Sequence, residues 1–427
     1  MNMEMEEKIK KKVYYRINFV LASPLLIGCG NNNYTDNDIL RDSNNVPYIP
    51  ASSLAGIVFD LLKNDKDVNK YLGERPNYDE EYKNGKELTK LTKSKVLIYD
   101  ANLDEGQEYH TNYRDCVALD EYKVAKPGSK FDMEILEAGV KFTTYIEQNV
   151  YEGDECFADK IASLWFNQKI LIGAKTMRGF GCIKDVKIEK KEFDLRDEGS
   201  TREWLDFDMY NYQKWDEFKN NVTLYEMPEI VLKLKQQGGI SIRRYTTNIA
   251  GKMPHDYEQL VSHSDNNQSL PVVPGTSWAG AFRRRMEELK PGCCEKYFGM
   301  INKENKTKSR IRFSESYIYN AKAKKMVRNA IDRFTGGTVE NALFTEKSYY
   351  FGDTTLVIRY DNEVEDEFLD ILAAAITDLH YGYLAIGGLT SVGRGLFSIE
   401  TINNIELSKE NPYNQIREIL RKGRDGK

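Results

Sequence analysis

The chain has 427 residues, of which 41% are apolar and 30% are charged, and its formal net charge is −5. This length predicts two domains of about 200 residues each, and the negative charge argues against a protein that coats nucleic acid by electrostatics alone. No apolar run is long enough to span a bilayer, and six cysteines without paired spacing predict a reducing, cytoplasmic setting.

The chain opens with a pattern typical of a strand followed by a helix. Apolar residues alternate at Tyr15, Ile17, Phe19 and Leu21, which predicts a half-buried strand. A polar loop over 31–45 leads into segment 47–56. There Ser52 and Ser53 precede an apolar helical run, and hydroxyl side chains at that place are good N-caps.

The remainder of the first half predicts further strands and a second helix. Segment 64–91 is polar and predicts a mobile insertion, and a strand follows over 94–100. Arg114 comes next, with Asp120 downstream. The second helix has its apolar face at Phe157, Ile161, Leu164 and Trp165. Residues 196–226 are acidic and aromatic, which indicates a packed connector rather than a flexible linker.

The second half repeats this order. Its first strand alternates at Ile230, Leu232 and Leu234. Segment 271–280 again carries two hydroxyls, Thr276 and Ser277, at the start of a helix, and a strand follows over 309–314. The next helix places Phe368, Ile371, Leu372, Ile376 and Leu379 on one face. The tail, 404–427, predicts a short basic helix near its end.

Two glycine-rich loops keep the same register across the two halves. The pairs Gly173 and Gly387, Gly179 and Gly393, and Gly181 and Gly395 are each separated by 214 positions (387 − 173). The shared order of strand, helix, strands, helix and strand is ferredoxin-like, as in RNA-recognition modules. We therefore predict an α+β chain of two tandem ferredoxin-like (RRM-like) domains with loop insertions. The predicted boundaries are 1–195, 196–226 for the connector, 227–403, and 404–427 for the tail.

These repeated features resemble the repeat-associated mysterious proteins (RAMPs) of CRISPR–Cas systems, in particular the backbone subunits of type III effector complexes. Four ordered elements carry the resemblance in each half: the proline–small–hydroxyl–hydroxyl turn, the Ser-Lys/Arg strand, the Arg…Asp segment and the glycine-rich loop. Stretch 328–337, followed by Ala342-Leu343-Phe344, is especially similar to the family pattern. The resemblance implies two fused RAMP modules that hold guide RNA and the target paired to it.

The resemblance also implies a catalytic position. In the family, an aspartate in the loop between the first strand and the proline turn supports metal-dependent cleavage of target RNA, and this position falls on Asp36. The implied cofactor is Mg²⁺ or another divalent cation, with Asp36 as its ligand. The corresponding loop of the second half is longer; Asp256 is our assignment there, with Glu258 and Asp265 as close alternatives.

The resemblance, the repetition of the glycine loops and the nearby cations together predict an RNA-binding set. It comprises Ser52, Ser53, Gly173, Lys175, Arg178, Gly179, Gly181, Arg243, Arg244, Thr276, Ser277, Arg283, Arg284, Gly387, Gly388, Gly393, Arg394 and Gly395. The simpler alternatives are that the glycines only form tight helix-to-strand connections, that the arginines are a solvated helix face, and that Asp36 is a solvated loop acid. The first half also departs from the family, because Ala51 replaces its usual glycine.

The predicted function is a subunit of a type III CRISPR ribonucleoprotein that binds guide (CRISPR) RNA and cleaves single-stranded target RNA. Its predicted partners are these RNAs and other subunits of the complex, and no membrane partner is predicted. One alternative is a guide-binding scaffold without nuclease activity. Another is a metal-independent guide-maturation endoribonuclease that uses His255 or His263 as general acid or base. The pattern leaves open whether one module cleaves or both.

Overall fold

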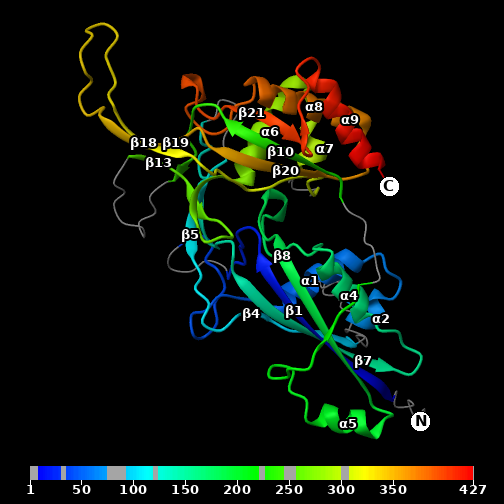
Figure 1. Cartoon of the computed structure of the whole chain (residues 1–427). Helices are drawn as coiled ribbons and strands as arrows, with labels where there is room; N and C mark the ends of the chain where they lie inside the picture. Colours follow the sequence, from blue (N-terminus) through cyan, green and yellow to red (C-terminus); the bar gives the residue numbers. More distant parts are fainter. Residues whose placement is uncertain are drawn as a thin grey trace, which may run out of the picture.

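The computed structural model describes residues 8–29, 35–74, 93–118, 124–220, 227–244, 256–299 and 307–426. They form two α+β modules, one above the other in the view of Figure 1. The predicted insertion 64–91 lies outside the described residues from position 75 onward. None of the helices in the described part is long and apolar enough to cross a membrane.

The first module is built on an antiparallel sheet with the strand order β2-β4-β7-β1-β8-β9, and β3 also pairs with β7. The strands are β1 (Ile9–Leu21), β2 (Tyr48–Ile49), β3 (Val96–Ile98), β4 (Ala101–Leu103), β7 (Lys141–Tyr151), β8 (Ile183–Asp194) and β9 (Asp216–Glu217). The helices are α1 (Ala51–Leu62), α2 (Val68–Leu72) and α4 (Ala158–Phe166). The central position of β1 between β7 and β8 is the ferredoxin-like arrangement, so the predicted fold class is confirmed.

Both faces of this sheet are covered, each by a different part of the chain. On one face the alternating residues of β1 pack against α4, and the rings of Phe19 and Trp165 lie 4.9 Å apart. On the other face lies the aromatic segment 196–220 with its helix α5 (Glu198–Leu205). Trp204 Nε1 donates to the Tyr14 hydroxyl at 3.1 Å, and the Arg16 guanidinium lies over the Trp215 ring at 5.1 Å. Burial of these aromatic side chains ties the segment to the first module.

The second module repeats the topology with the strand order β16-β20-β10-β21-β22. Its strands are β10 (Glu229–Gln236), β16 (Ile311–Phe313), β20 (Asp353–Tyr360), β21 (Phe397–Ile402) and β22 (Ile405–Glu406), and its helices are α6 (Gly275–Leu289), α7 (Cys294–Phe298) and α8 (Asp366–Tyr381). The tail forms α9 (Pro412–Asp425), which packs beside α8 (Figure 1). Ile416 and Leu420 of α9 are fully buried, so this helix completes the second core.

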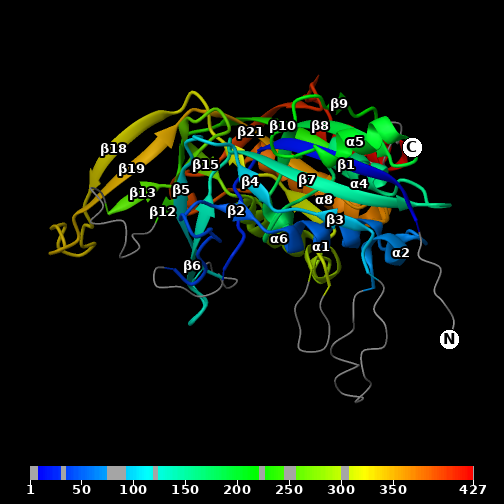
Figure 2. The same ribbon diagram turned by 90° about the horizontal axis from the view of Figure 1, so that it is seen from below.

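Each module also carries a β-hairpin between its second and third core strands. The first consists of β5 (Thr111–Cys116) and β6 (Phe131–Leu136), and the second of β18 (Lys322–Arg328) and β19 (Phe344–Tyr350). Smaller strands extend or adjoin the second: β11 (Gly239–Ile240), β12 (Arg243–Arg244), β13 (Tyr257–Gln259), β14 (Val261–His263), β15 (Ser269–Val273) and β17 (Ser316–Tyr317). The second hairpin protrudes far from the body, and β5 and β6 lie on the same side of the molecule (Figure 1 and Figure 2).

The predicted hydroxyl N-caps are wrong. Helices α1 and α6 begin at Ala51 and Gly275, before the hydroxyl residues, with Pro50 and Pro274 as N-caps and no side-chain capping bond. In the first module the Ala51 N–H instead donates to Asp100 Oδ1 at 2.6 Å. A carboxylate from the turn after β3 therefore stabilises the start of α1, where the helix dipole favours a negative charge.

Candidate nucleic-acid interface

Asp36 is held against the first hairpin by a reciprocal pair of hydrogen bonds. Its backbone N–H donates to Asp132 Oδ1 at 2.8 Å, and its own Oδ2 accepts from the Asp132 backbone N–H at 3.0 Å. Asp36 is exposed and Asp132 is half-buried. The two carboxylates, which we call the first site, are thus brought together across 96 positions of sequence.

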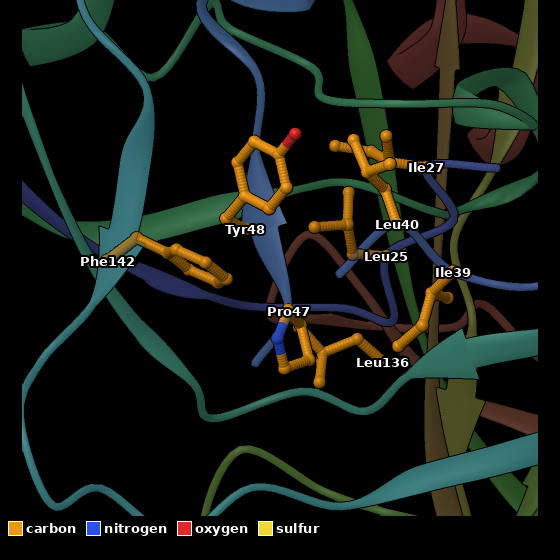
Figure 3. A pocket seen from close by; sticks show the side chains of 8 residues that line it. All are labelled: Leu25, Ile27, Ile39, Leu40, Pro47, Tyr48, Leu136 and Phe142. Atoms are coloured by element: carbon orange, nitrogen blue, oxygen red, sulfur yellow. The ribbon is translucent and has the colours of Figure 1, made fainter. Parts of the chain in front are cut away.

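The loop that carries Asp36 is anchored by apolar packing. Ile39 and Leu40 converge with residues of β2, β6 and β7 (Figure 3). The gap among these side chains has a volume of about 10 Å³, which is close to the space of a single water. Arg41 pairs with Glu134 of β6 at 2.6 Å. The loop is therefore a packed element, and the carboxylate of Asp36 is preorganised on it.

Asp256 has the same relation to the second hairpin. Its Oδ2 accepts from the Thr345 backbone N–H at 2.7 Å and from the Thr345 hydroxyl at 2.9 Å. Thr345 follows Phe344 as Asp132 follows Phe131, and these phenylalanines are 213 positions apart (344 − 131). Asp256 and Thr345, our second site, thus occupy the place of Asp36 and Asp132. Asp265, one alternative for this role, instead pairs with Lys184 of the first module at 2.5 Å.

Cations surround the second site. Lys325 of β18 lies opposite Lys347 of β19, and Lys347 shares a face of the strand with Thr345 because alternate residues point the same way. The Arg243 guanidinium stacks on the Tyr257 ring at 3.9 Å. Arg244 of β12 lies opposite Glu258 of β13 in the strand register. Tertiary structure therefore places Arg243 and Arg244 on the strand beside the one that follows Asp256.

Three groups at these sites had not been assigned a function from the sequence: Asp132, Thr345 and the pair Lys325 and Lys347. The repeated Phe-Asp and Phe-Thr dipeptides, one position off the main register, were the available signal for the first two. At the first site one nearby cation is Lys175, whose Nζ lies over the Phe131 ring at 4.3 Å. The described residues thus place Lys175 beside the hairpin that holds Asp36.

The repeated glycines are explained by close backbone approaches inside the protein. A Cβ at Gly181 would lie 1.8 Å from the Ile172 carbonyl oxygen, and one at Gly395 would lie 1.8 Å from that of Ile386. Both glycines have positive φ, +68° and +74°. Gly173 and Gly387 face backbone of their own modules in the same way, and the Gly388 N–H donates to the Ser241 carbonyl. Tight connection is sufficient to account for the four glycines with positive φ, Gly173, Gly181, Gly387 and Gly395.

The first glycine loop is also part of the contact between the modules. A Cβ at Gly179 would lie 2.5 Å from the Glu315 nitrogen, and a Cβ at Gly275, the first residue of α6, would lie 2.2 Å from the Arg178 carbonyl oxygen. Arg178 Nη2 donates to the Phe298 carbonyl at 3.4 Å. Burial and the neighbouring Arg283 lower the pKa of Arg178. Arg178 therefore contacts the second module at the start of α6 and the end of α7.

This contact predicts opposite effects for two glycines of the same helix. Gly275→Ala is expected to destabilise the chain by about 1–3 kcal/mol, because the new methyl group overpacks the contact with the first module. The control is Gly280→Ala, whose new methyl group would have no heavy atom of a neighbouring element within 4 Å, and it is expected to stabilise α6 by about 0.5–1 kcal/mol. Urea denaturation of both variants measures the difference, and shifts of the same sign would contradict this role of Gly275.

Other predicted RNA-binding residues lie in different surroundings. Arg394 is 3% exposed in its side chain and donates to Glu346 Oε2 at 2.9 Å, so it fastens the second hairpin from inside. Arg284 pairs with Glu288 on the surface of α6. Exposed positions are Ser52, Thr276, Arg283 and Gly393, and partly buried positions are Ser53 and Ser277.

The histidines and cysteines do not form an open catalytic cluster among the described residues. The His263 ring stacks on His110 of the first module with centroids 4.1 Å apart, and burial together with His110 lowers the pKa of His263. His255 lies outside the described residues, as does Asp120. Within the described ranges, Glu287, Cys293 and Cys294 are the one group of three ligand-type side chains close enough to hold a metal ion. Burial raises the pKa of both thiols, which opposes metal binding.

Comparison with known proteins identifies one family. A family model described as the RAMP superfamily matches residues 18–184 and 254–398. No curated protein matches the sequence. Among solved structures, the chain is similar to a chain of the type III-B Cmr-beta complex bound to cognate target RNA, with 17% identity and a TM-score of 0.32. That match covers 42% of this chain and 60% of the other.

Proposed function

The chain belongs to the RAMP superfamily, and from this we propose that it is a double-module backbone subunit of a type III CRISPR ribonucleoprotein. In this proposal it binds guide RNA and cleaves the complementary target RNA. The observation that carries the proposal is the pair of equivalent acids, Asp36 and Asp256, each bonded to the same place on the hairpin of its module. A scaffold would not need an exposed carboxylate preorganised in this way twice.

The first site has the oxygen donors that a divalent cation prefers. Mg²⁺ is commonly bound by one or two carboxylates together with substrate phosphates and water. Asp36 and Asp132 offer two carboxylates, and each uses one oxygen in the hydrogen bonds between them. Both residues would hold the ion, which when bound would polarise the scissile phosphate or favour ionisation of the ribose hydroxyl.

The second site offers one carboxylate and a hydroxyl. Asp256 and Thr345 replace the two acids of the first site, so we propose weaker cation binding there. The protein's own contribution is positional: the hydrogen bonds from Thr345 orient the carboxylate, and Lys325 and Lys347 attract the phosphates of the RNA beside it. Guide pairing rather than base contacts would select the cleaved position.

The second hairpin is the proposed RNA-binding surface of that site. It carries Lys322, Lys324, Lys325, Arg328, Arg333 and Lys347. Most of β18 is exposed. The cations lie on a strand pair that protrudes from the body (Figure 1), which lets them reach an RNA backbone despite the net negative charge of the whole chain.

Neutralising this surface is expected to weaken RNA binding and its dependence on salt. Lys325→Gln and Lys347→Gln should each reduce the slope of log affinity against log salt concentration by about 0.7–1, because each removes one phosphate contact. The measurement is a salt titration of guide RNA paired to its target, bound by the purified protein. Lys409→Gln, an exposed lysine outside the hairpin, is the control and should leave the slope unchanged; equal slopes for all three variants would contradict the assignment.

The alternative functions remain distinguishable. A scaffold would bind RNA equally well and cleave nothing. A guide-maturation nuclease would work in EDTA and depend on a histidine; of its two candidates, His263 lies stacked between the modules, which does not favour proton transfer to RNA.

A further inference from the structure

The second module has an acceptor face that the first module covers. We define it by Gly275, Phe298, Arg312 and Glu315, which contact the first module. Arg178 Nη2 donates to the Phe298 carbonyl, Arg312 Nη2 donates to Cys182 Sγ at 2.6 Å, and Glu315 pairs with Arg114 at 2.6 Å. Two arginines of the first module, Arg114 and Arg178, therefore contact this face.

The first module has the same face in the corresponding elements. The hydroxyls of Ser94 and Ser309 donate to the carbonyls of Tyr71 and Tyr297, respectively. Gly73 and Gly299 end α2 and α7 with φ of +79° and +77°. The same alignment matches Leu72 with Phe298, one residue before these glycines, and Leu97 and Asp100 with Arg312 and Glu315, at fixed distances after the serines. Ala51 matches Gly275, since each is the first helical residue after its N-cap proline.

The corresponding face of the first module is exposed and hollowed. Leu97 is 47% exposed, whereas its counterpart Arg312 is 6% exposed. A pocket of about 330 Å³ opens here between α1, the end of α2 and β3, and its lining includes Gly56, Phe59, Leu72 and Glu74. By this alignment it corresponds to the place that Arg178 occupies on the second module. Among the described residues, one copy of this place therefore holds an arginine and the other is a pocket.

We propose that this pocket receives an arginine from the glycine-rich loop of a RAMP module in a different subunit. The inference rests on the proposed function, since that subunit would belong to the same ribonucleoprotein. It follows from continuity with the contact inside the chain: the partner would cover the first module as the first module covers the second.

Charge complementarity identifies the side chain that enters. Glu74 lines the pocket, and the Leu72 carbonyl stands where the Phe298 carbonyl accepts from Arg178. A guanidinium could pair with the carboxylate and donate to the carbonyl at once. Asp100 is exposed in the position of Glu315, so a second cation of the partner would lie there.

A second copy of this chain fits less well. Its second module would present Val392 in place of Arg178, since these residues are 214 positions apart (392 − 178), and valine cannot pair with Glu74. The partner loop must also lie farther from α1 than in the internal contact, because Ala51 carries the methyl group for which Gly275 has no room. Both features favour a different subunit with an arginine-bearing loop.

Photo-crosslinking within the assembled ribonucleoprotein tests the proposal. Phe59→p-benzoylphenylalanine places the probe in the pocket, and Leu61→p-benzoylphenylalanine places it on the same helix outside the lining. Irradiation followed by mass spectrometry is expected to join position 59, and not position 61, to a glycine-rich segment containing arginine in another subunit. A second variant, Gly56→Trp, should fill the pocket and reduce recovery of that subunit about tenfold or more, whereas Leu61→Trp should not.

The other outcomes overturn the inference. Adducts from position 59 only with RNA, with this chain's own residues or with the 390–393 loop of a second copy would each show a different occupant. An assembled complex that contains guide RNA and neighbouring subunits but yields no adduct at position 59 would refute the docking while leaving the proposed function intact. A chain that co-purifies with neither RNA nor other subunits would refute both.

Discussion

Asp36→Asn is expected to abolish one cleavage of the target RNA while leaving RNA binding unchanged. The asparagine side chain can still accept the hydrogen bond from the Asp132 N–H, so the loop should keep its place. It removes the negative charge that would hold the cation, and the loss of such electrostatic stabilisation slows reactions by about 10²–10³-fold. The fall should appear in the rate at one position of the target and not in its affinity.

Matched variants distinguish the two sites. Asp256→Asn should remove a second, different cleavage product by the same reasoning, and the double variant should remove both. Asp132→Asn should raise the Mg²⁺ concentration required for the first cleavage, because Oδ1 of the new side chain can still accept from Asp36 while one carboxylate is lost. Glu340→Gln, an exposed acid of the second hairpin loop, should change neither product.

The measurement is cleavage of end-labelled complementary RNA by the assembled complex, with a Mg²⁺ titration and an EDTA arm. Cleavage at the second site should need more Mg²⁺ than cleavage at the first, since Thr345 supplies a hydroxyl where Asp132 supplies a carboxylate. Persistence of every product in the double variant would refute both assignments and favour the scaffold. Cleavage that survives EDTA would favour the metal-independent nuclease.

Arg114→Met is expected to give the largest loss of stability in the contact between the modules. Arg114 donates to both carboxylate oxygens of Glu315, at 2.6 and 3.2 Å, and to the Ser262 hydroxyl at 2.7 Å. That hydroxyl donates to Glu137 at 2.5 Å. Burial raises the pKa of the Glu315 carboxyl, and pairing with Arg114 opposes this shift. Removing the cation leaves buried carboxylates unpaired, a change that costs about 3–5 kcal/mol.

Urea denaturation monitored by tryptophan fluorescence measures this loss, and two further variants identify its cause. Adding Glu315→Gln to Arg114→Met should restore part of the stability, because it removes one of the unpaired charges. Arg202→Ala breaks a pair with Glu198 whose side chains are 76% and 82% exposed, and it should change stability by less than about 1 kcal/mol. Equal losses for Arg114→Met and Arg202→Ala would contradict the buried pair's role.

Periodic and local patterns in the sequence predicted the two ferredoxin-like modules. Alternation along Ile230, Leu232 and Leu234 indicated a strand with one buried face, and all three are fully buried. The 214-residue register of the glycines predicted the repeat, and those residues have matching positive φ values. These features depend on neighbours within a few positions, so they can be read from the chain itself. At the start of α1 the hydroxyl residues do not cap the helix, and a carboxylate takes that place: Asp100 accepts from the Ala51 N–H across 49 positions.

The sequence by itself therefore determined the fold class, the internal repeat and the candidate acids, whereas tertiary structure decided what each group contacts. Asp36 finds Asp132 across 96 positions and Asp256 finds Thr345 across 89, and no local periodicity encodes either pairing. Local sequence also does not distinguish Arg178 from Arg394, since each is a cation beside a glycine loop. Arg178 lies between the modules, whereas Arg394 lies inside the second module. Which surface a charge faces depends on how distant elements pack, and burial rather than residue type then decides whether it can meet RNA.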